Sequence, residues 1–468
     1  MFAALGAAMF AHAQSNPSSA ANPFYGSITV QPVTDGELKL SLDDAVRRGL
    51  DTNLGLKQAE FSENNIRGQF NQAIQQFLPT ILLTGNSGYH MYNLEAQGFG
   101  PGFVQSLLPI LPPGTDLSNL SFITRAQVTQ GQIHYDQTLF SGPVIAGFKA
   151  AGAGMRAAHF AKMSARGEVV QQVATAYLRA IAAASEVDNA KAQEQADLVA
   201  YNNAREAHVA GIAANLDELR ARVQYQTQQQ ARIAAENTLE KSLILLKREI
   251  GVDPGQKIVL TDRAPYNELA AQTPEEVRAI AYKNRQDYQN LQNQLVELKA
   301  VNQAYRAQRL PTLSFHGYYG VTEVASIGSH GDFVASGELK FPIFREAELR
   351  GGIDASRAQL DSARAQLDDL RMKIDQQVRS ELLDVAANAK LVDVAKSNVD
   401  LATRALSDET ERVNAGVDDT LPLVTAQASL SAAQTNFVES LYQYNLSKLL
   451  LARVAGILET QYRDYLGR

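Results

Sequence analysis

The stretch TLSFHGYYGVT, residues 312–322, decides the fold of this 468-residue chain. Its odd-numbered positions are apolar or glycine, and its even-numbered positions are mostly polar: Leu313, Phe315, Gly317, Tyr319 and Val321 alternate with Ser314, His316, Tyr318 and Gly320. A period of two over this length predicts a β-strand with one apolar face and one polar face. At about 10 residues, the stretch has the length of a tilted strand that crosses a lipid bilayer.

Three other stretches repeat or approach this pattern. Residues 333–343 alternate as strictly, with Phe and Leu on one face and Ser, Glu and Lys on the other. In residues 78–93, the apolar side chains of one parity are Ile81, Leu83, Tyr89 and Met91. In residues 125–140, Ala126 and Val128 have the opposite parity to Ile133 and Tyr135. This mismatch predicts a bulge or a membrane exit within that strand.

Four strands per chain cannot close a barrel, for which about eight strands are the practical minimum. Lipid tolerates no open sheet edge, so strands that span a membrane would require the chain to assemble with copies of itself. A small soluble sheet is the alternative interpretation of the same pattern.

Two long segments without proline predict the helical part of the molecule. They are residues 144–253 and 345–421. In the second segment, apolar side chains recur every seven residues, slip once by four, and resume: Leu360, Leu367 and Ile374, then Val378, Val385, Val392, Val399, Leu406 and Val413. A sustained heptad predicts a left-handed coiled coil, and the slip is a stutter that locally unwinds it. About 65 helical residues would reach roughly 100 Å.

Each long segment reverses at a glycine, at 209–215 and at 414–420. A glycine there can adopt the positive φ of a helix C-cap. We expect Asn215 and Thr420 to cap the returning helices, with Glu218 completing a capping box in the first. From these hairpins alone, an unrelated coiled-coil scaffold would be the better interpretation.

The sequence contains an internal repeat. A shift of 232 positions aligns SLDD at 41–44 with TPEE at 273–276, and each is a hydroxyl N-cap followed by an acid three residues on. A shift of 205 positions aligns the glycines of the two long-helix turns, and also aligns Gly251 with Gly456. Both halves therefore share one order, which is helix, strand, loop, strand and long helical hairpin.

The composition excludes several functions. A net charge of −7 argues against a nucleic-acid-binding protein. The absence of cysteine excludes thiol nucleophiles, Cys-ligated zinc, disulfides and a lipidated N-terminal cysteine. The seven histidines show no H-E-x-x-H motif and no i, i+4 pair. We therefore expect no metal, no cofactor and no catalysis.

The first residues have the pattern of a signal peptide. An apolar run from Phe2 to Phe10 leads into an A-x-A cleavage motif at 11–13. Because no basic n-region precedes the run, we expect the true start codon to lie upstream. An Ala-rich disordered tail is the alternative. No later stretch has the 18 or so uninterrupted apolar residues of a membrane helix, so any membrane span must consist of strands.

Eight stretches carry a resemblance to a known family: LSLDDAVRRGLDTN (40–53), FLPTILLTGNSGY (77–89), DQTLFSG (136–142), AYLRAIAA (176–183), the turn at 209–219, RLPTLSFHGYYG (309–320), FPIFREAELRGGIDASRAQL (341–360) and VNAGVDDTLPLVTAQASLSAAQ (413–434). In these stretches, and in their order, the chain resembles the TolC family of outer-membrane efflux proteins. The resemblance covers nearly everything from residue 40 to 456. Each motif alone is unspecific, whereas their order and duplicated spacing are specific.

The resemblance implies a mainly α-helical protein with a membrane β-barrel. Three protomers would contribute four strands each to a 12-stranded barrel, which a long periplasmic α-helical coiled-coil barrel continues. The implied organisation is a signal peptide at 1–13, an extended N-terminal segment at 14–40, a first repeat at 41–250 (helix 41–77, strands 78–93 and 122–140, hairpin 144–250), a linker or equatorial region at 251–272, a second repeat at 273–456 (helix 273–309, strands 311–323 and 331–344, hairpin 345–456) and a C-terminal tail at 457–468.

The resemblance also implies a homotrimer in the outer membrane of a Gram-negative bacterium, an inner-membrane transporter as energy source, and a periplasmic adaptor that bridges the two. In the family the adaptor docks on the hairpin tips, which here comprise Val209, Ala210, Gly211, Asn215, Leu216, Asn414, Ala415, Gly416, Thr420 and Leu421.

Family members often narrow the periplasmic entrance with acids just past the tip glycine. The candidates here are Asp217, Asp418 and Asp419, with Arg412 as a candidate ion-pair partner. Where some members carry two aspartates in the second repeat, this chain has Pro422 and Thr425. That departure puts an aspartate ring at the entrance in doubt.

The predicted function is an outer-membrane export duct without enzymatic activity. It would conduct solutes, whether drugs, metabolites, metals or secreted protein, from the adaptor and transporter to the cell exterior. The alternative is a soluble oligomeric coiled-coil scaffold or a surface adhesin. The sequence does not identify the cargo, because the inner-membrane partner selects most of it.

Overall fold

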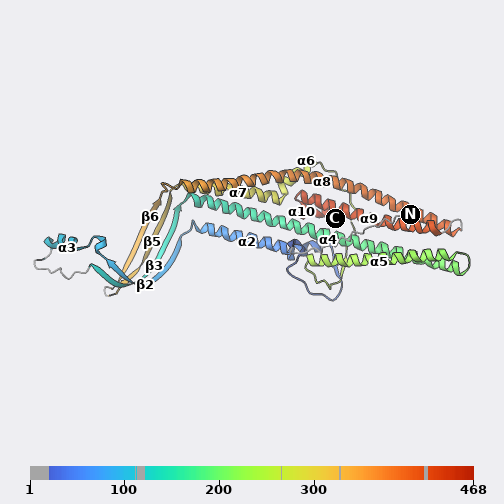
Figure 1. Ribbon diagram of the computed structural model, residues 1–468, viewed down its shortest axis with the longest axis horizontal. Helices are drawn as coiled ribbons and strands as arrows, with labels where there is room; N and C mark the ends of the chain where they lie inside the picture. The colour runs from blue at the N-terminus through green and yellow to red at the C-terminus, as the bar shows by residue number, and fades with distance from the viewer. Residues whose placement is uncertain are drawn as a thin grey trace, which may run out of the picture. The chain divides into compact units, whose positions relative to one another are not determined.

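The computed structural model describes residues 21–110, 112, 122–264, 266–325, 328–415 and 420–467 (Figure 1). The signal peptide expected at 1–13 lies outside these residues. The chain forms two compact units. One contains the segments up to Asn65, Arg156–Asn293 and from Ala363 onward, and the other contains Ile66–Met155 and Gln294–Ser362. Within the described ranges, no helix is both long enough and apolar enough to cross a membrane.

The second unit contains a four-stranded sheet, whose strands lie side by side (Figure 1). The strands are β2 (Thr80–Asn93), β3 (Ile123–Phe140), β5 (Thr312–Val324) and β6 (Gly328–Lys340). Their order is β2-β3-β5-β6, and every neighbouring pair is antiparallel. The pairing of β3 with β5 joins the two sequence repeats in one sheet. Strands β2 and β6 form its two edges.

Strand β6 differs most from its predicted range of 331–344. It begins at Gly328 and ends at Lys340. It ends there because Pro342 has no N–H to donate to a ladder. The residues that follow are highly exposed, with Ile343 at 92% and Phe344 at 89%.

The register places the apolar parity of all four strands on one face. Leu83 pairs with Ile133, Ile133 with Tyr319, and Tyr319 with Phe333, so these side chains form one row across the sheet. All four are more than half exposed in the single chain. The two-faced strand expected from residues 312–322 is therefore confirmed.

A register shift does occur within residues 125–140, where a bulge or a membrane exit was expected, but it does not lie near Ala126 and Val128. The β2–β3 ladder continues in register through this region, and the one register shift of the described sheet lies between Thr138 and Phe140. Ala126 and Val128 belong to the opposite face, where they are buried, with 8% and 3% of their surface exposed. The two residues therefore differ in parity from Ile133 and Tyr135 because they lie on the opposite face of the same regular strand, and not because a bulge inserts an extra residue between them.

Each repeat opens with a pair of helices, and not with the single helices expected at 41–77 and 273–309. The pairs are α1 (Leu42–Thr52) with α2 (Leu54–Gln75), and α6 (Pro274–Asn284) with α7 (Gln286–Ala307). The break residues Asn53 and Arg285 have an extended backbone, with ψ of 131° and 120°. The two breaks are related by the 232-residue shift, so they are a feature of the repeat.

A glycine turn from the end of the same repeat contacts each break. Gly251 and Gly456 have φ of +69° and +74°, which favour glycine. A Cβ at Gly456 would lie 2.6 Å from the backbone nitrogen of Arg285, and one at Gly251 would lie 2.9 Å from Oγ1 of Thr52. Because these contacts come from far along the chain, no local pattern indicates the breaks.

Hydroxyl caps start both helix pairs, as the repeat predicts. Ser41 Oγ accepts a hydrogen bond from the Asp44 N–H at 3.2 Å. Thr273 Oγ1 accepts one from the Glu276 N–H at 3.3 Å, and the Glu276 carboxylate accepts one from the Thr273 N–H at 3.0 Å. The second cap is a complete capping box.

The substitution Thr273→Ala removes the hydroxyl that caps α6. It should lower the free energy of unfolding by about 1 kcal/mol, because one N–H of the first turn of α6 loses its acceptor. Denaturant unfolding of the purified protein measures this loss. The control is Thr238→Ala, since this exposed hydroxyl lies inside a helix and bonds only to the carbonyl of Ala234. Equal unfolding midpoints for the two variants would contradict a stabilising role of the capping box.

Two long helical hairpins follow the helix pairs. They are α4 (Gly142–Val209) with α5 (Asn215–Glu249), and α8 (Glu346–Asn414) with α9 (Thr420–Val454). In α8 the heptad positions are buried from Leu360 to Val392. Ile374 and Val378, on either side of the four-residue slip, are both 0% exposed. The later positions Val399, Leu406 and Val413 are half-buried. The heptad and its stutter are therefore confirmed over most of α8.

The C-terminal segment, expected to be a tail at 457–468, contains helix α10 (Leu458–Leu466). One face of α10 is apolar and buried, and it consists of Leu458, Tyr462, Tyr465 and Leu466. The Tyr462 hydroxyl donates a hydrogen bond to Asp43 at 2.6 Å. The linker at 251–272 contains strand β4 (Ile258–Leu260), which pairs in parallel with β1 (Leu38–Leu40). The other short elements are η1 (Pro23–Tyr25), η2 (Glu95–Gln97), α3 (Pro101–Leu107) and η3 (Leu108–Ile110).

Candidate functional site

The tip of the first hairpin is an exposed turn with an apolar surface. Helix α4 ends at Val209, and Gly211 follows with φ of +73°. Val209 and Ile212 are each 81% exposed. Apolar side chains this exposed at the end of a long helical hairpin are typical of a surface that another protein covers.

The expected capping of the return helix is wrong. The N-cap of α5 is Ala214, without a side-chain hydrogen bond, and Asn215 is already the first helical residue. Glu218 does not complete a capping box, because its Oε2 lies 2.5 Å from His208 Nδ1 on α4. This contact holds the two arms of the hairpin together just above the turn.

The tip of the second hairpin is described in part. Helix α8 ends at Asn414, Ala415 is exposed, and α9 begins at Thr420. The predicted tip residue Gly416 lies outside the described residues. The same holds for the candidate entrance acids Asp418 and Asp419.

The two remaining entrance candidates are described. Asp217 lies in the first turn of α5, and its carboxylate is 3.5 Å from Arg220 NH1 on the same helix. Arg412 is exposed in the last turn of α8. The pairing of Arg412 with Asp418 or Asp419 stays a prediction.

A groove between α5 and α9 joins predicted tip residues of the two hairpins. It has a volume of about 380 Å³ and is lined by Leu216, Leu219, Arg220, Val223, Gln224, Leu421 and Val424. Leu216 and Leu421, predicted from separate turns, are exposed by 55% and 50% and face the same groove. We call it the tip groove.

Three apolar residues of the tip groove were not among the predicted tip residues: Leu219, Val223 and Val424. Leu216, Leu219 and Val223 lie at i, i+3 and i+7, which is one face of α5. That spacing was a usable signal. On α9, Val424 lies three residues after the predicted tip residue Leu421, which is the same spacing, but only the packing of α5 against α9 shows that the two faces line one groove.

The sheet supplies the second part of the site, which is a polar face opposite the apolar one. On this face Asp136 Oδ1 lies 2.6 Å from His316 Nδ1, and Glu338 Oε2 lies 2.8 Å from Lys340 Nζ. One face of the sheet carries these charged and hydrogen-bonding side chains, and the other carries exposed Leu83, Ile133, Tyr319 and Phe333. Such a division is typical of a strand sheet that separates water from lipid.

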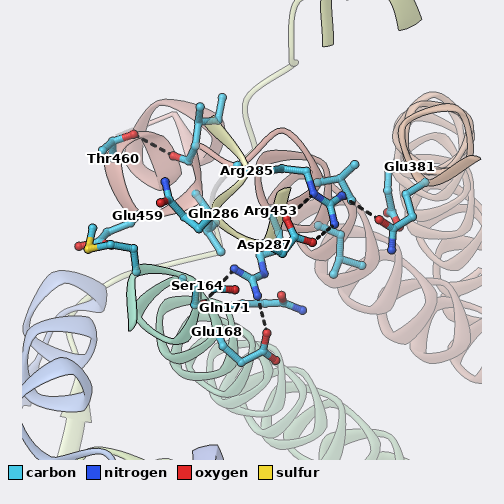
Figure 2. A pocket seen from close by; sticks show the side chains of 18 residues that line it. Ser164, Glu168, Gln171, Arg285, Gln286, Asp287, Glu381, Arg453, Glu459 and Thr460 are labelled. Atoms are coloured by element: carbon cyan, nitrogen blue, oxygen red, sulfur yellow. Dashed lines mark hydrogen bonds and ion pairs between the residues drawn. The ribbon is translucent and has the colours of Figure 1, made fainter. Parts of the chain in front are cut away.

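The first unit contains a charged pocket of about 490 Å³, which is lined by residues of α4, α7, α8, the end of α9 and the start of α10 (Figure 2). Arg453 reaches Glu168 at 2.6 Å, and Arg285 reaches Asp287 at 2.7 Å. Gly167 permits the first contact, because a Cβ there would lie 2.5 Å from Arg453 NH1.

Both arginines of this pocket are paired with acids, whereas Glu381 has no basic partner among the lining residues. Burial would raise the pKa of Asp287, but its hydrogen bonds and charge interaction with Arg285 outweigh burial and lower it. Burial and the neighbouring Asp384 raise the pKa of Glu381. Among the described residues, no group of three or more His, Cys, Asp or Glu side chains could hold a metal ion. We interpret the pocket as an ion-paired junction of helices.

A four-stranded two-faced sheet and two long helical hairpins define a TolC-like fold. The sequence model described as "Outer membrane efflux protein" matches residues 46–252 and 278–457, which is most of the chain, and the chain therefore belongs to that family. Membership places it in the outer membrane of a Gram-negative bacterium, with its helical part in the periplasm. The family is one of export channels and not of enzymes.

Solved structures share this fold at low sequence identity. A membrane protein from Pseudomonas aeruginosa matches with a TM-score of 0.71 at 20% identity, over 92% of this chain and 96% of that chain. The outer-membrane channel CmeC of Campylobacter jejuni matches with 0.72 at 15% identity, over 95% of each chain. The open state of the MtrE channel of Neisseria gonorrhoeae matches with 0.71 at 18% identity, over 92% and 95%. No curated protein sequence matches the chain.

Proposed function

We propose that three copies of this chain form an export duct that carries solutes from the periplasm to the cell exterior. The observation that carries this proposal is the open sheet, with its two unlike faces and its two edges, β2 and β6. An open edge in lipid leaves backbone groups without hydrogen bonds, each at a cost of several kcal/mol. Pairing β6 of one copy with β2 of the next removes every edge when three copies close a 12-stranded barrel.

The polar face of the sheet would then line a water-filled path, and the apolar face would contact lipid. The hairpins of repeats 41–250 and 273–456 would surround the same axis and continue the path into the periplasm. The energy for transport would come from an inner-membrane transporter, because the chain has no nucleotide-binding motif and no other energy-converting motif in its sequence. Family membership supports the duct over the alternative of a soluble scaffold or surface adhesin.

The tips would dock the periplasmic adaptor through the tip groove. Leu216 and Leu421 would be central to this contact, together with the exposed turn from Val209 to Gly211. Asp217, Arg412, Asp418 and Asp419 would form the entrance, which opens when the adaptor engages the tips.

The duct itself is tested by reconstitution into planar lipid bilayers. We expect discrete conductance steps, with larger or more frequent steps when the tip is destabilised by Glu218→Ala, which removes the contact with His208. A purified protein that leaves bilayer permeability unchanged in both forms would refute the duct.

The docking surface is tested by Leu421→Asp, which places a charge in the apolar tip groove. Dye efflux from cells that depend on this channel, its adaptor and its transporter should fall about tenfold or more, as for the loss of one interface hot spot. The control is Gln226→Asp on the exposed side of α5, which should export normally. Normal efflux by Leu421→Asp, at an equal amount of channel in the outer membrane, would show that docking occurs elsewhere.

A further inference from the structure

Four of the seven histidines of the chain lie on one face of the sheet. In each ladder, up to the register shift after Thr138, even-numbered residues pair with even-numbered residues. The even-numbered side chains of all four strands therefore share the polar face. This face carries His90 of β2, His134 of β3, His316 of β5 and His330 of β6, which we call the sheet histidines.

His316 lies between two carboxylates of the neighbouring strands. Its Nδ1 is 2.6 Å from Asp136 Oδ1 on β3, and its Nε2 is 3.4 Å from Glu338 Oε2 on β6. Ser314 on the same strand has its Oγ 2.9 Å from Nε2, and Glu338 also contacts Lys340. A protonated imidazole has an N–H at both nitrogens and can donate to both carboxylates, whereas a neutral imidazole can donate to only one. Protonation of His316 therefore changes the charge and the hydrogen bonds of this part of the face.

His134 lies beside His316 on the other central strand. Its Nε2 is 3.0 Å from Thr84 Oγ1 on β2, and its ring centroid is 5.4 Å from that of Tyr318 on β5. Asp136 follows two residues further along β3. His134 is half-buried, as is His316, so both central histidines remain accessible to water.

The edge strands carry the other two sheet histidines, and both are exposed. His90 stacks on Tyr92 of its own strand, with 5.8 Å between the ring centroids, and pairs with uncharged Ala126 on β3. His330 pairs with Thr322 on β5, and the acid closest to it along β6 is Asp332. The Asp332 carboxylate accepts a hydrogen bond from the Tyr318 hydroxyl at 3.1 Å.

Protonation of the sheet histidines would reverse the sign of the charge on the polar face. The other ionised side chains of this face, among the described strand residues, are three carboxylates and one ammonium group: Asp136, Asp332, Glu338 and Lys340. With neutral histidines they leave two negative charges per chain, and four protonated histidines would convert these into two positive charges. Between about pH 5 and 8, histidine changes its charge, while carboxylates, lysine and tyrosine ordinarily keep theirs.

We propose that the sheet histidines set the charge selectivity of the path through the barrel, which favours cations above about pH 7 and anions below about pH 5.5. This inference rests on the proposed duct, in which the polar face lines the path. Three copies would place twelve histidines around one water-filled path. The wall charge acts on passing ions most strongly at low salt, because the screening length is about 30 Å at 0.01 M.

Reversal potentials of the full-length protein in planar bilayers of zwitterionic lipid test the proposal. In a dilute KCl gradient, the permeability ratio of K⁺ to Cl⁻ should fall about threefold or more between about pH 8 and pH 5.5, because the wall charge changes sign. With all four sheet histidines replaced by glutamine, the ratio should keep its alkaline value at both pH values. The proposal is overturned if this variant responds to pH as the wild type does.

Single substitutions give an answer that does not depend on assembly of the fourfold variant. His316→Arg fixes a positive charge, since arginine stays protonated, and should lower the permeability ratio already at about pH 8. His316→Gln should leave the alkaline ratio unchanged and weaken the pH response. A wild-type ratio at about pH 8 in His316→Arg would contradict the proposal.

The matched control is His159→Gln, a histidine of α4 outside the sheet. Its partner Glu63 retains Lys162 at 2.6 Å, so the substitution leaves no unpaired carboxylate. This control should show the full pH response of the wild type. Loss of the response in His159→Gln would assign it to the helical unit and overturn the role of the sheet histidines.

Failure of the proposed function would look different. A wild-type protein that conducts no ions at either pH would refute the duct, and the inference with it. A wild-type protein that conducts with the same permeability ratio at both pH values would leave the duct standing and refute the inference alone.

Discussion

Phe333→Arg should abolish assembly of the chain in the outer membrane. Phe333 lies on the apolar face of β6, is 72% exposed in the single chain, and pairs in register with Tyr319. If this face contacts lipid, an arginine at the bilayer midplane destabilises each copy by about 2–4 kcal/mol, and this applies to all three copies of a trimer. The measurement is the amount of heat-modifiable oligomer in isolated outer membranes, which should fall to near zero.

The matched control lies three residues further along the same strand. Ser336 is exposed on the polar face, so Ser336→Arg adds the same charge to the opposite side of β6. We expect Ser336→Arg to assemble and to change only the ion selectivity of the conductance. If both variants assembled equally well, the apolar face could not be the lipid-facing one.

Glu249→Gln should strongly change the pH dependence of the stability of the first unit. Glu249 ends α5 and is 3% exposed, and burial raises its pKa to about 8, opposed only by the hydrogen bond from Gln172. Its Oε2 has no hydrogen-bond partner among the described residues. The folded protein therefore keeps this carboxyl protonated at neutral pH.

The sign of the effect follows from the two pKa values. In the unfolded chain the carboxyl ionises near pH 4.3, so between about pH 4.3 and 8 the unfolded state loses a proton that the folded state keeps. Wild-type stability then falls by about 1.4 kcal/mol per pH unit across this window, which amounts to roughly 4 kcal/mol at pH 7. The Glu249→Gln variant lacks this carboxyl, so its stability should not fall in this way as the pH rises.

Thermal unfolding of wild type and Glu249→Gln between pH 4 and 8.5 measures the difference. The buried amide adds an offset that does not depend on pH, so the diagnostic is the widening gap in stability as pH rises. Glu240→Gln, an exposed carboxylate on the same helix, is the control. A gap that stays constant across the window would show that Glu249 ionises equally in both states.

Several tertiary features had no signature in the sequence. The breaks at Asn53 and Arg285 depend on turns at Gly251 and Gly456, which meet them only in the folded chain. The expected cap at Asn215 failed because Ala214 is the N-cap and Asn215 already lies in the helix, while Glu218 contacts His208 on the other arm of the hairpin. The capping pattern at 215–218 is local, whereas the contact of Glu218 with His208 forms only when the two arms of the hairpin pack together, so the pattern alone could not show it.

The candidate site was predictable in place but not in composition. The turns indicated where the tips lie, since a glycine between two long heptad segments has few other structural uses. The tip groove as a whole was not predictable, because it combines α5 with α9.

By itself, the sequence determined the elements: two-faced strands from a period of two, a coiled coil from a period of seven, and a duplicated order from two constant shifts. These are short-range patterns, and the geometry of each element follows from them directly. The tertiary structure alone decided that β3 pairs with β5, that the leading helices break, and that α5 and α9 line one groove. Those features depend on contacts between residues far apart in the chain, whose energies no single stretch of sequence contains.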